Sequence, residues 1–170
     1  MKLPKGPFDI IVADPPWKFK TWSEKGMSKS AENHYDTLTT DQIARMKLPV
    51  GKNALLLLWA TSPMVLDAIR VLQDWGFIYK SSFVWDKKII SHGFWNRGQH
   101  EFVLIGRRGT FPIPPGKHRR SSVISEQRTR HSAKPEALQD WVDTAYPKAK
   151  KLELFARRKR KGWTVWGNEV

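Results

Sequence analysis

The 170-residue sequence predicts an α/β fold, a single doubly wound domain spanning residues 1–170. Apolar runs with strand character alternate with segments whose apolar residues recur at helical spacing, which is typical of helices packed on a sheet. No internal repeat or linker divides the chain, and its length suits one domain with a proper core.

The first strand is predicted at residues 8–13, where the run FDIIVA ends at Asp14-Pro15-Pro16-Trp17. Prolines fix φ and donate no backbone hydrogen bond, so two in succession force the chain out of a sheet ladder and hold it extended. Residues 18–34 show no periodicity and predict a long loop. Thr39 and Gln42 then have the spacing of a capping box, which predicts a short helix.

The remaining elements alternate in the same way. They are, in chain order, a buried strand at 53–62, a helix opened by Ser62 and Pro63 and closed by Gly76, a strand pair at 77–86 and 100–109, a second long loop at 110–132 around a short SSVIS segment at 121–125, a helix from Pro135 to Pro147, and strands at 150–157 and 163–170. Ligands bind such sheets beyond the carboxyl ends of the strands. We therefore expect Asp14 to Trp17 and the segment after Phe155 to meet in one cleft.

The charge predicts a polyanionic partner. Lys and Arg outnumber Asp and Glu by 30 to 16, a net charge of +14, of which +11 falls in residues 86–170. A solvated surface or a disordered tail is the alternative that charge alone leaves open. Nine tryptophans exceed what a core of this size needs, so some are candidates for stacking on bases.

Composition also excludes several kinds of site. The chain has no cysteine, and its five histidines show no metal-ligand spacing, so we expect no metal site. The longest apolar run, residues 54–60, is far shorter than the ~20 residues of a membrane span, and no apolar signal core is evident. We expect a cytoplasmic protein, a monomer or homodimer, with no membrane contact.

The Asp-Pro-Pro-Trp stretch suits chemistry on the exocyclic amine of adenine, whose lone pair is delocalised and poorly nucleophilic. The Asp14 carboxylate and a proline-locked carbonyl at Pro15 could accept the two amine hydrogens and favour attack on an electrophile. The Trp17 ring could stack on the extracted base.

Further motifs accompany this stretch in a fixed order. They are His34, Tyr35 and Thr37; LLLWAT; Trp85 and Lys87; HE-VLIGRRG; HSAKPE at 131–136; LELFAR at 152–157; and a closing tryptophan with GNE at 163–169. In these motifs the chain resembles the amino-methyltransferases acting on adenine in nucleic acids, in the branch related to the messenger-RNA adenosine methyltransferases with its bacterial and phage members.

The resemblance implies a Rossmann-like methyltransferase domain with a permuted motif order, in which the catalytic strand comes first. It implies S-adenosylmethionine as cofactor, S-adenosylhomocysteine as product, and site-specific methylation of the adenine 6-amino group. DNA is favoured as the polymer. RNA methylation and a non-catalytic nucleic-acid-binding subunit are the alternatives, and a small-molecule or protein amine is a weaker one.

The resemblance also implies residue roles. The catalytic residues would be Asp14, Pro15, Pro16 and Trp17. The cofactor would contact Asp14, Lys134, Glu153, Phe155, Arg157, Asn168 and Glu169, with Ser132 assisting. The target base would contact Trp17, Tyr35 and Lys134.

Basic residues are expected to contact the phosphates of the nucleic acid. We predict these contacts for Arg119 and Arg120 in the second long loop, and for Arg158 and Arg160, where this chain has RKRKG in place of the asparagine that the family often places after ELFAR.

Some of these residues have simpler interpretations. Lys134 could lie in the first turn of a helix without a role in the site, and Glu153 could pair with an arginine. We assign Trp59, Trp75 and Trp85 to the core, and His100 and Glu101 to the wall of the site.

Overall fold

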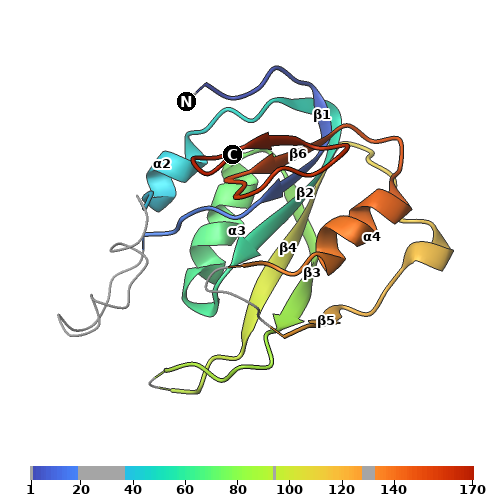
Figure 1. Cartoon of the computed structure of the whole chain (residues 1–170). Coiled ribbons are helices and arrows are strands. Elements are labelled where there is room, and N and C mark those ends of the chain that lie inside the picture. Colours follow the sequence, from blue (N-terminus) through green and yellow to red (C-terminus); the bar gives the residue numbers. More distant parts are fainter. Residues whose placement is uncertain (1, 19–36, 94, 128–132) are drawn as a thin grey trace.

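The computed structural model describes residues 2–18, 37–93, 95–127 and 133–170, in which helices cover both faces of a seven-stranded sheet (Figure 1). The strands are β1 (Phe8–Ala13), β2 (Val50–Ala60), β3 (Ile78–Asp86), β4 (His100–Arg108), β5 (Val123–Ser125), β6 (Lys151–Leu154) and β7 (Thr164–Trp166). The helices are α2 (Thr40–Ala44), α3 (Val65–Asp74) and α4 (Ala137–Ala145), with 3₁₀ turns η2 (Ser62–Met64) and η3 (Gly116–His118).

The strand order is β5-β3-β4-β2-β1-β6-β7, and every neighbouring pair is parallel except those that β4 makes with β2 and β3. β1 lies near the centre, with Ala13 opposite Leu58 of β2 and Leu154 of β6. β2 continues to Ala60, which faces Phe102 at the start of β4. The carboxyl ends of β1, β2 and β6 therefore share one edge with the beginning of β4.

Alternation along β1 divides the core into two layers. Ile11 and Ala13 pack with α2 and α3 on one face, whereas Ile10 and Val12 pack with α4 on the other. All four side chains are at most 1% exposed. Burial of a side chain the size of isoleucine contributes about 1.5–3 kcal/mol, so both helical layers fix the position of β1.

The predicted elements are largely confirmed. β1 has the predicted bounds, and the capping box is present, since the Thr39 hydroxyl accepts from Gln42 N–H at 3.2 Å and the Gln42 side chain accepts from Thr39 N–H at 2.8 Å. The helix after Pro63 ends before Gly76, whose φ of 80° suits glycine.

One strand was not predicted. β5 lies inside the segment interpreted as a loop and pairs with β3, with Ile124 buried opposite Trp85. Most of the first long loop lies outside the described residues. The single domain and the permuted motif order stay predictions.

Candidate active site

The Asp14-Pro15-Pro16-Trp17 turn leaves the sheet at the end of β1. Trp17 N–H donates to the Pro15 carbonyl at 2.8 Å, and Leu38 N–H donates to the Pro16 carbonyl at 2.8 Å. Each carbonyl has a second lone pair, so Pro15 can still accept a ligand hydrogen. These bonds hold the turn in the rigid, non-helical form that the two prolines predict.

The Trp17 side chain fastens this turn to β2. Its ring is 6% exposed, and its indole N–H donates to the Trp59 carbonyl at 3.1 Å. A buried ring with its N–H engaged positions the turn. The predicted stacking of Trp17 on a target base stays a prediction, and it would require the ring to become more exposed.

Asp14 belongs to a cluster of four charged side chains, which we call the four-charge cluster: Asp14, Lys134, Glu101 and Lys87. Lys134 Nζ lies 3.1 Å from Asp14 Oδ1 and 3.0 Å from Glu101 Oε2, while Lys87 Nζ lies 3.5 Å from Glu101 Oε1. The four side chains are between 12% and 23% exposed. Lys134 Nζ also lies over the Trp59 ring, 5.3 Å from its centre, which adds a cation–π contact. The cluster joins the ends of β1 and β3, the start of β4 and the segment before α4.

The three inner charges of this cluster differ in how well they are compensated. Burial raises the pKa of Asp14 above its ordinary value, and Lys134 offsets that only in part. Burial alone would raise the pKa of Glu101, but Lys134 and Lys87 outweigh it and lower that pKa. Burial would lower the pKa of Lys134, but Asp14 and Glu101 outweigh it and raise that pKa. Asp14 is therefore the under-compensated anion, suited to accept from an amine that gains positive charge.

β6 is the parallel neighbour of β1, so its carboxyl end lies beside Asp14. Glu153 Oε1 accepts from Gln139 Nε2 of α4 at 3.2 Å, and burial raises the pKa of Glu153, with the Asp14 charge adding to the rise. Gln139 is 2% exposed, and its Oε1 has no partner among the described residues. Phe155 has a φ of 61° and packs edge-on against Trp166. The sequence signalled Glu153 and Phe155 through ELFAR but gave no indication of Gln139.

The segments after β6 and β7 also approach one another. Ala156 N–H donates to the Trp166 carbonyl at 3.0 Å, and a Cβ on Gly167 would collide with the Ala156 backbone. Arg157 Nε lies 3.6 Å from Glu169 Oε1. The exposed Asn168 lies between Gly167 and Glu169. The predicted cofactor residues at 153–157 and 168–169 thus fall in one region next to Asp14.

Two of the predicted phosphate contacts are engaged within the protein. Arg160 donates to Glu136, Asp140 and Asp143 at 2.6–3.2 Å, and Arg158 pairs with Glu136. Arg160 is 20% exposed. These contacts tie the loop after β6 to α4, so the geometry gives no support to a phosphate role for Arg160.

The other two arginines lie away from Asp14. Arg119 and Arg120 line an apolar pocket of about 240 Å³ formed with β3, Trp141 and Tyr146. Arg120 also donates to the Ala137 carbonyl at 2.9 Å. That pocket includes none of the residues around Asp14, so the structure does not bring these arginines to the site.

Two predicted residues, Tyr35 and Ser132, lie outside the described residues. Within the described part, no group of three or more His, Asp and Glu could hold a metal ion, and no helix is long and apolar enough to cross a membrane. The assignment of Trp59, Trp75 and Trp85 to the core is confirmed, because each is at most 5% exposed.

Comparison with known proteins gives consistent matches. The MT-A70 family model matches residues 8–169. A Type II methyltransferase of a Mycoplasma species, M.MunI, is 33% identical over 187 residues, covering 99% of this chain and 80% of that protein. The human N(6)-adenine-specific methyltransferase METTL4 is 29% identical, covering 96% of this chain and 37% of that protein. The N6-methyladenosine RNA methyltransferase MTA1 of Pyricularia oryzae is 29% identical, with 96% of this chain and 47% of that protein covered. The chain spans less than half the length of these two eukaryotic relatives.

Proposed function

The chain belongs to the MT-A70 family, and from that membership we propose that it transfers a methyl group from S-adenosylmethionine to the 6-amino group of adenine in DNA. The observation that carries the proposal is the under-compensated Asp14 carboxylate, held by Lys134 at the end of a proline-locked strand. An acceptor fixed in this way suits a poorly nucleophilic amine, because it does not have to reorganise as charge develops.

The residues present fit S-adenosylmethionine. Glu153 offers a half-buried carboxylate for ribose hydroxyls, and it is bonded to Gln139, whose Oε1 has no partner among the described residues. We assign the remaining contacts to the other side chains at the ends of β1, β6 and β7 and before α4, namely Asp14, Lys134, Phe155, Arg157, Asn168 and Glu169. When bound, the cofactor supplies a methyl group on a positively charged sulfur.

The chain's own residues would act on the amine. Asp14 accepts one amine hydrogen and the Pro15 carbonyl accepts the other, which draws electron density to the nitrogen lone pair. As the nitrogen gains positive charge, Asp14 stabilises it, and the departing proton passes to Asp14 or to solvent. Lys134 keeps Asp14 oriented, and Glu101 with Lys87 keeps Lys134 in place.

The match to M.MunI, a Type II methyltransferase of which this chain covers 80%, favours DNA over RNA. The match to the RNA methyltransferase MTA1 keeps RNA as the second candidate. The net charge of +14 suits either polymer. A monomer or homodimer stays the expected assembly.

The test measures transfer of labelled methyl from S-adenosylmethionine to duplex DNA, single-stranded DNA and RNA of one base composition. Asp14→Asn is the control variant, because it keeps the side-chain shape and removes the charge. We expect methyl on DNA adenine with the wild type and none with the variant. Methyl on RNA alone would move the assignment to RNA. If the chain binds nucleic acid but transfers no methyl group to any of the three polymers, it is a non-catalytic subunit.

A further inference from the structure

Trp95 is the one tryptophan among the described residues that is wholly exposed. Its relative exposure is 102%, whereas six of the other seven described tryptophans are at most 8% exposed. The seventh, Trp166, is half-buried, with its indole N–H bonded to the Lys2 carbonyl at 3.2 Å. A tryptophan held in water contributes nothing to the core, so its ring is available to contact a partner.

Trp95 lies on the loop between β3 and β4, which projects beyond the ends of these strands (Figure 1). The two arms of the loop are hydrogen-bonded to each other as far as Ser91 and Gly98. Lys87 N–H donates to the Gln99 carbonyl at 2.9 Å, and Ser91 N–H donates to the Gly98 carbonyl at 2.8 Å. A β-carbon on Gly93 would collide with the Asn96 carbonyl, so Gly93 and Asn96 lie close together next to Trp95.

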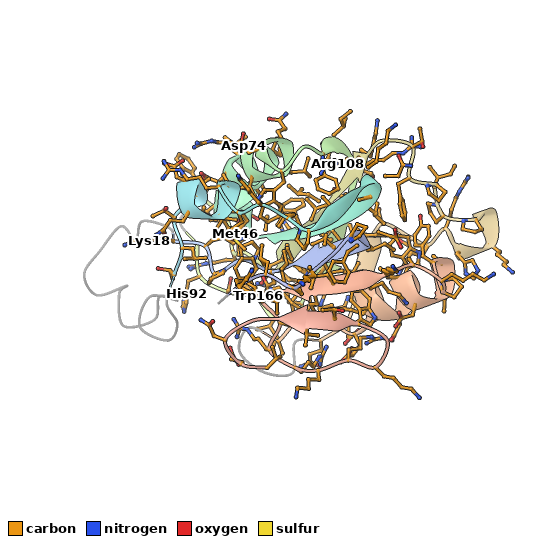
Figure 2. All side chains as sticks on the ribbon, turned by 90° about the horizontal axis from the view of Figure 1, so that it is seen from above. Lys18, Met46, Asp74, His92, Arg108 and Trp166 are labelled. Atoms are coloured by element: carbon orange, nitrogen blue, oxygen red, sulfur yellow. The ribbon has the colours of Figure 1, made fainter. Side chains whose placement is uncertain are left out.

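The base of this loop is part of the four-charge cluster. Lys87 opens the loop and contacts Glu101, which in turn holds Lys134 beside Asp14. Trp95 lies five residues before β4, so it is within roughly 16 Å of the strand end at ~3.3 Å per residue. Seen from above, His92 of this loop lies toward the same end of the molecule as Lys18, which directly follows Trp17 (Figure 2).

The charge of the loop favours nucleic acid as the partner. Residues 87–99 contain Lys87, Lys88 and Arg97 and no carboxylate. Lys88 is paired with Asp86, whereas Arg97 is exposed near the tip. An exposed ring with an exposed cation, Arg97, two residues away is a combination that can bind a base by stacking and the backbone by charge. A protein interface would call for a wider apolar surface than Trp95 and the exposed Ile90 provide.

We propose that Trp95 stacks on a base of the nucleic acid next to the adenine that is drawn into the site. This inference rests on the proposed function. Removing a base from its stack exposes the faces of its neighbours, and an indole placed there restores part of the lost stacking. The hydrogen bonds between the arms of the loop, and the contact of Lys87 with Glu101, connect the loop to the Asp14 site, so a stacked base would lie next to the adenine that enters.

The test compares Trp95→Ala with Trp95→Phe, Arg97→Ala and Leu66→Ala. Leu66 is 80% exposed on α3 and is the matched apolar control. Binding to a fluorescein-labelled 30-base-pair random duplex, and to RNA of the same sequence, is followed by anisotropy at several salt concentrations. We expect Trp95→Ala to weaken binding of the preferred polymer by roughly 5- to 100-fold with an unchanged salt slope. Trp95→Phe should stay within about threefold of wild type because it keeps a ring.

The controls separate stacking from charge. Arg97→Ala should lower the salt slope by about one, and Leu66→Ala should bind as wild type does. Equal affinity of Trp95→Ala and Leu66→Ala would overturn the inference, as would a wild-type chain that binds neither polymer. Loss of a wild-type dimer in Trp95→Ala, seen by sedimentation without any change in affinity, would assign the ring to a protein interface and overturn it too.

Methyl transfer is measured separately on the same variants. If the wild type binds through Trp95 but transfers no methyl group, the proposed activity is wrong, and Trp95 keeps a stacking contact with nucleic acid that is unrelated to a target adenine. Methyl transfer by Trp95→Ala with wild-type KM and kcat would remove the stacking role and leave the activity standing.

Discussion

Replacing Lys134 by methionine removes the cation that two carboxylates share. At an effective dielectric of about 20, unit charges 3 Å apart attract by about 5 kcal/mol, so the contacts to Asp14 and Glu101 are each large before desolvation is subtracted. Removing one partner of a buried pair typically costs about 3–5 kcal/mol. Because both carboxylates keep some exposure and Lys87 stays near Glu101, we expect Lys134→Met to lower the free energy of unfolding by about 3 kcal/mol.

Urea unfolding at pH 7 measures this change, with Lys87→Met as the matched control. Lys87 makes one longer contact, 3.5 Å to Glu101, so its loss should cost about 1 kcal/mol. Combining Lys134→Met with Asp14→Asn and Glu101→Gln should recover most of the stability, because no uncompensated carboxylate is left and Lys87 loses only its 3.5 Å contact with Glu101. Equal losses in the two single variants, or no recovery in the triple variant, would refute the reasoning.

Three more predictions follow from the same contacts. Because the pKa of Asp14 is raised above 3.8, kcat/KM should fall as the pH drops toward that raised pKa. Glu101→Gln should move this fall to lower pH, because it removes a nearby negative charge and Lys134 then pairs with Asp14 alone. An unchanged pH–rate profile in the variant would count against this role of Asp14. Trp17→Phe should lose about 1 kcal/mol in urea unfolding, since the Trp59 carbonyl loses its indole donor, and a stability equal to wild type would show that this bond contributes nothing. Arg160→Met should lose about 2 kcal/mol yet keep the salt slope of DNA binding, whereas a slope smaller by about one would assign Arg160 to phosphate.

The parts of the site that could be predicted depend on local signals. The end of β1 follows from an apolar run meeting two prolines, and its place beside β6 follows from the rule that ligands bind beyond parallel strand ends. The juxtaposition of Asp14 with Lys134 was expected only through the resemblance. The structure adds that Glu101 shares Lys134 with Asp14.

The rest depends on pairing between distant segments. Glu101 reaches Lys134 and Asp14 because β4 pairs antiparallel with β2, which places the start of β4 beside the carboxyl ends of β1 and β2, and strand patterns do not specify this pairing. Arg160 looked like a phosphate ligand because its segment is basic, but the loop folds back onto carboxylates of α4. The composition showed that tryptophan was in excess without showing which ring is exposed, so Trp95 emerged only from the fold.

The most direct test of the central claim is mass spectrometry of nucleosides after reaction with S-adenosylmethionine carrying a deuterated methyl group. The account predicts labelled N6-methyladenine from duplex DNA with the wild type and none with Asp14→Asn, while the variant still unfolds cooperatively. Label on any atom other than the adenine 6-amino nitrogen, or equal labelling by Asp14→Asn, would contradict it.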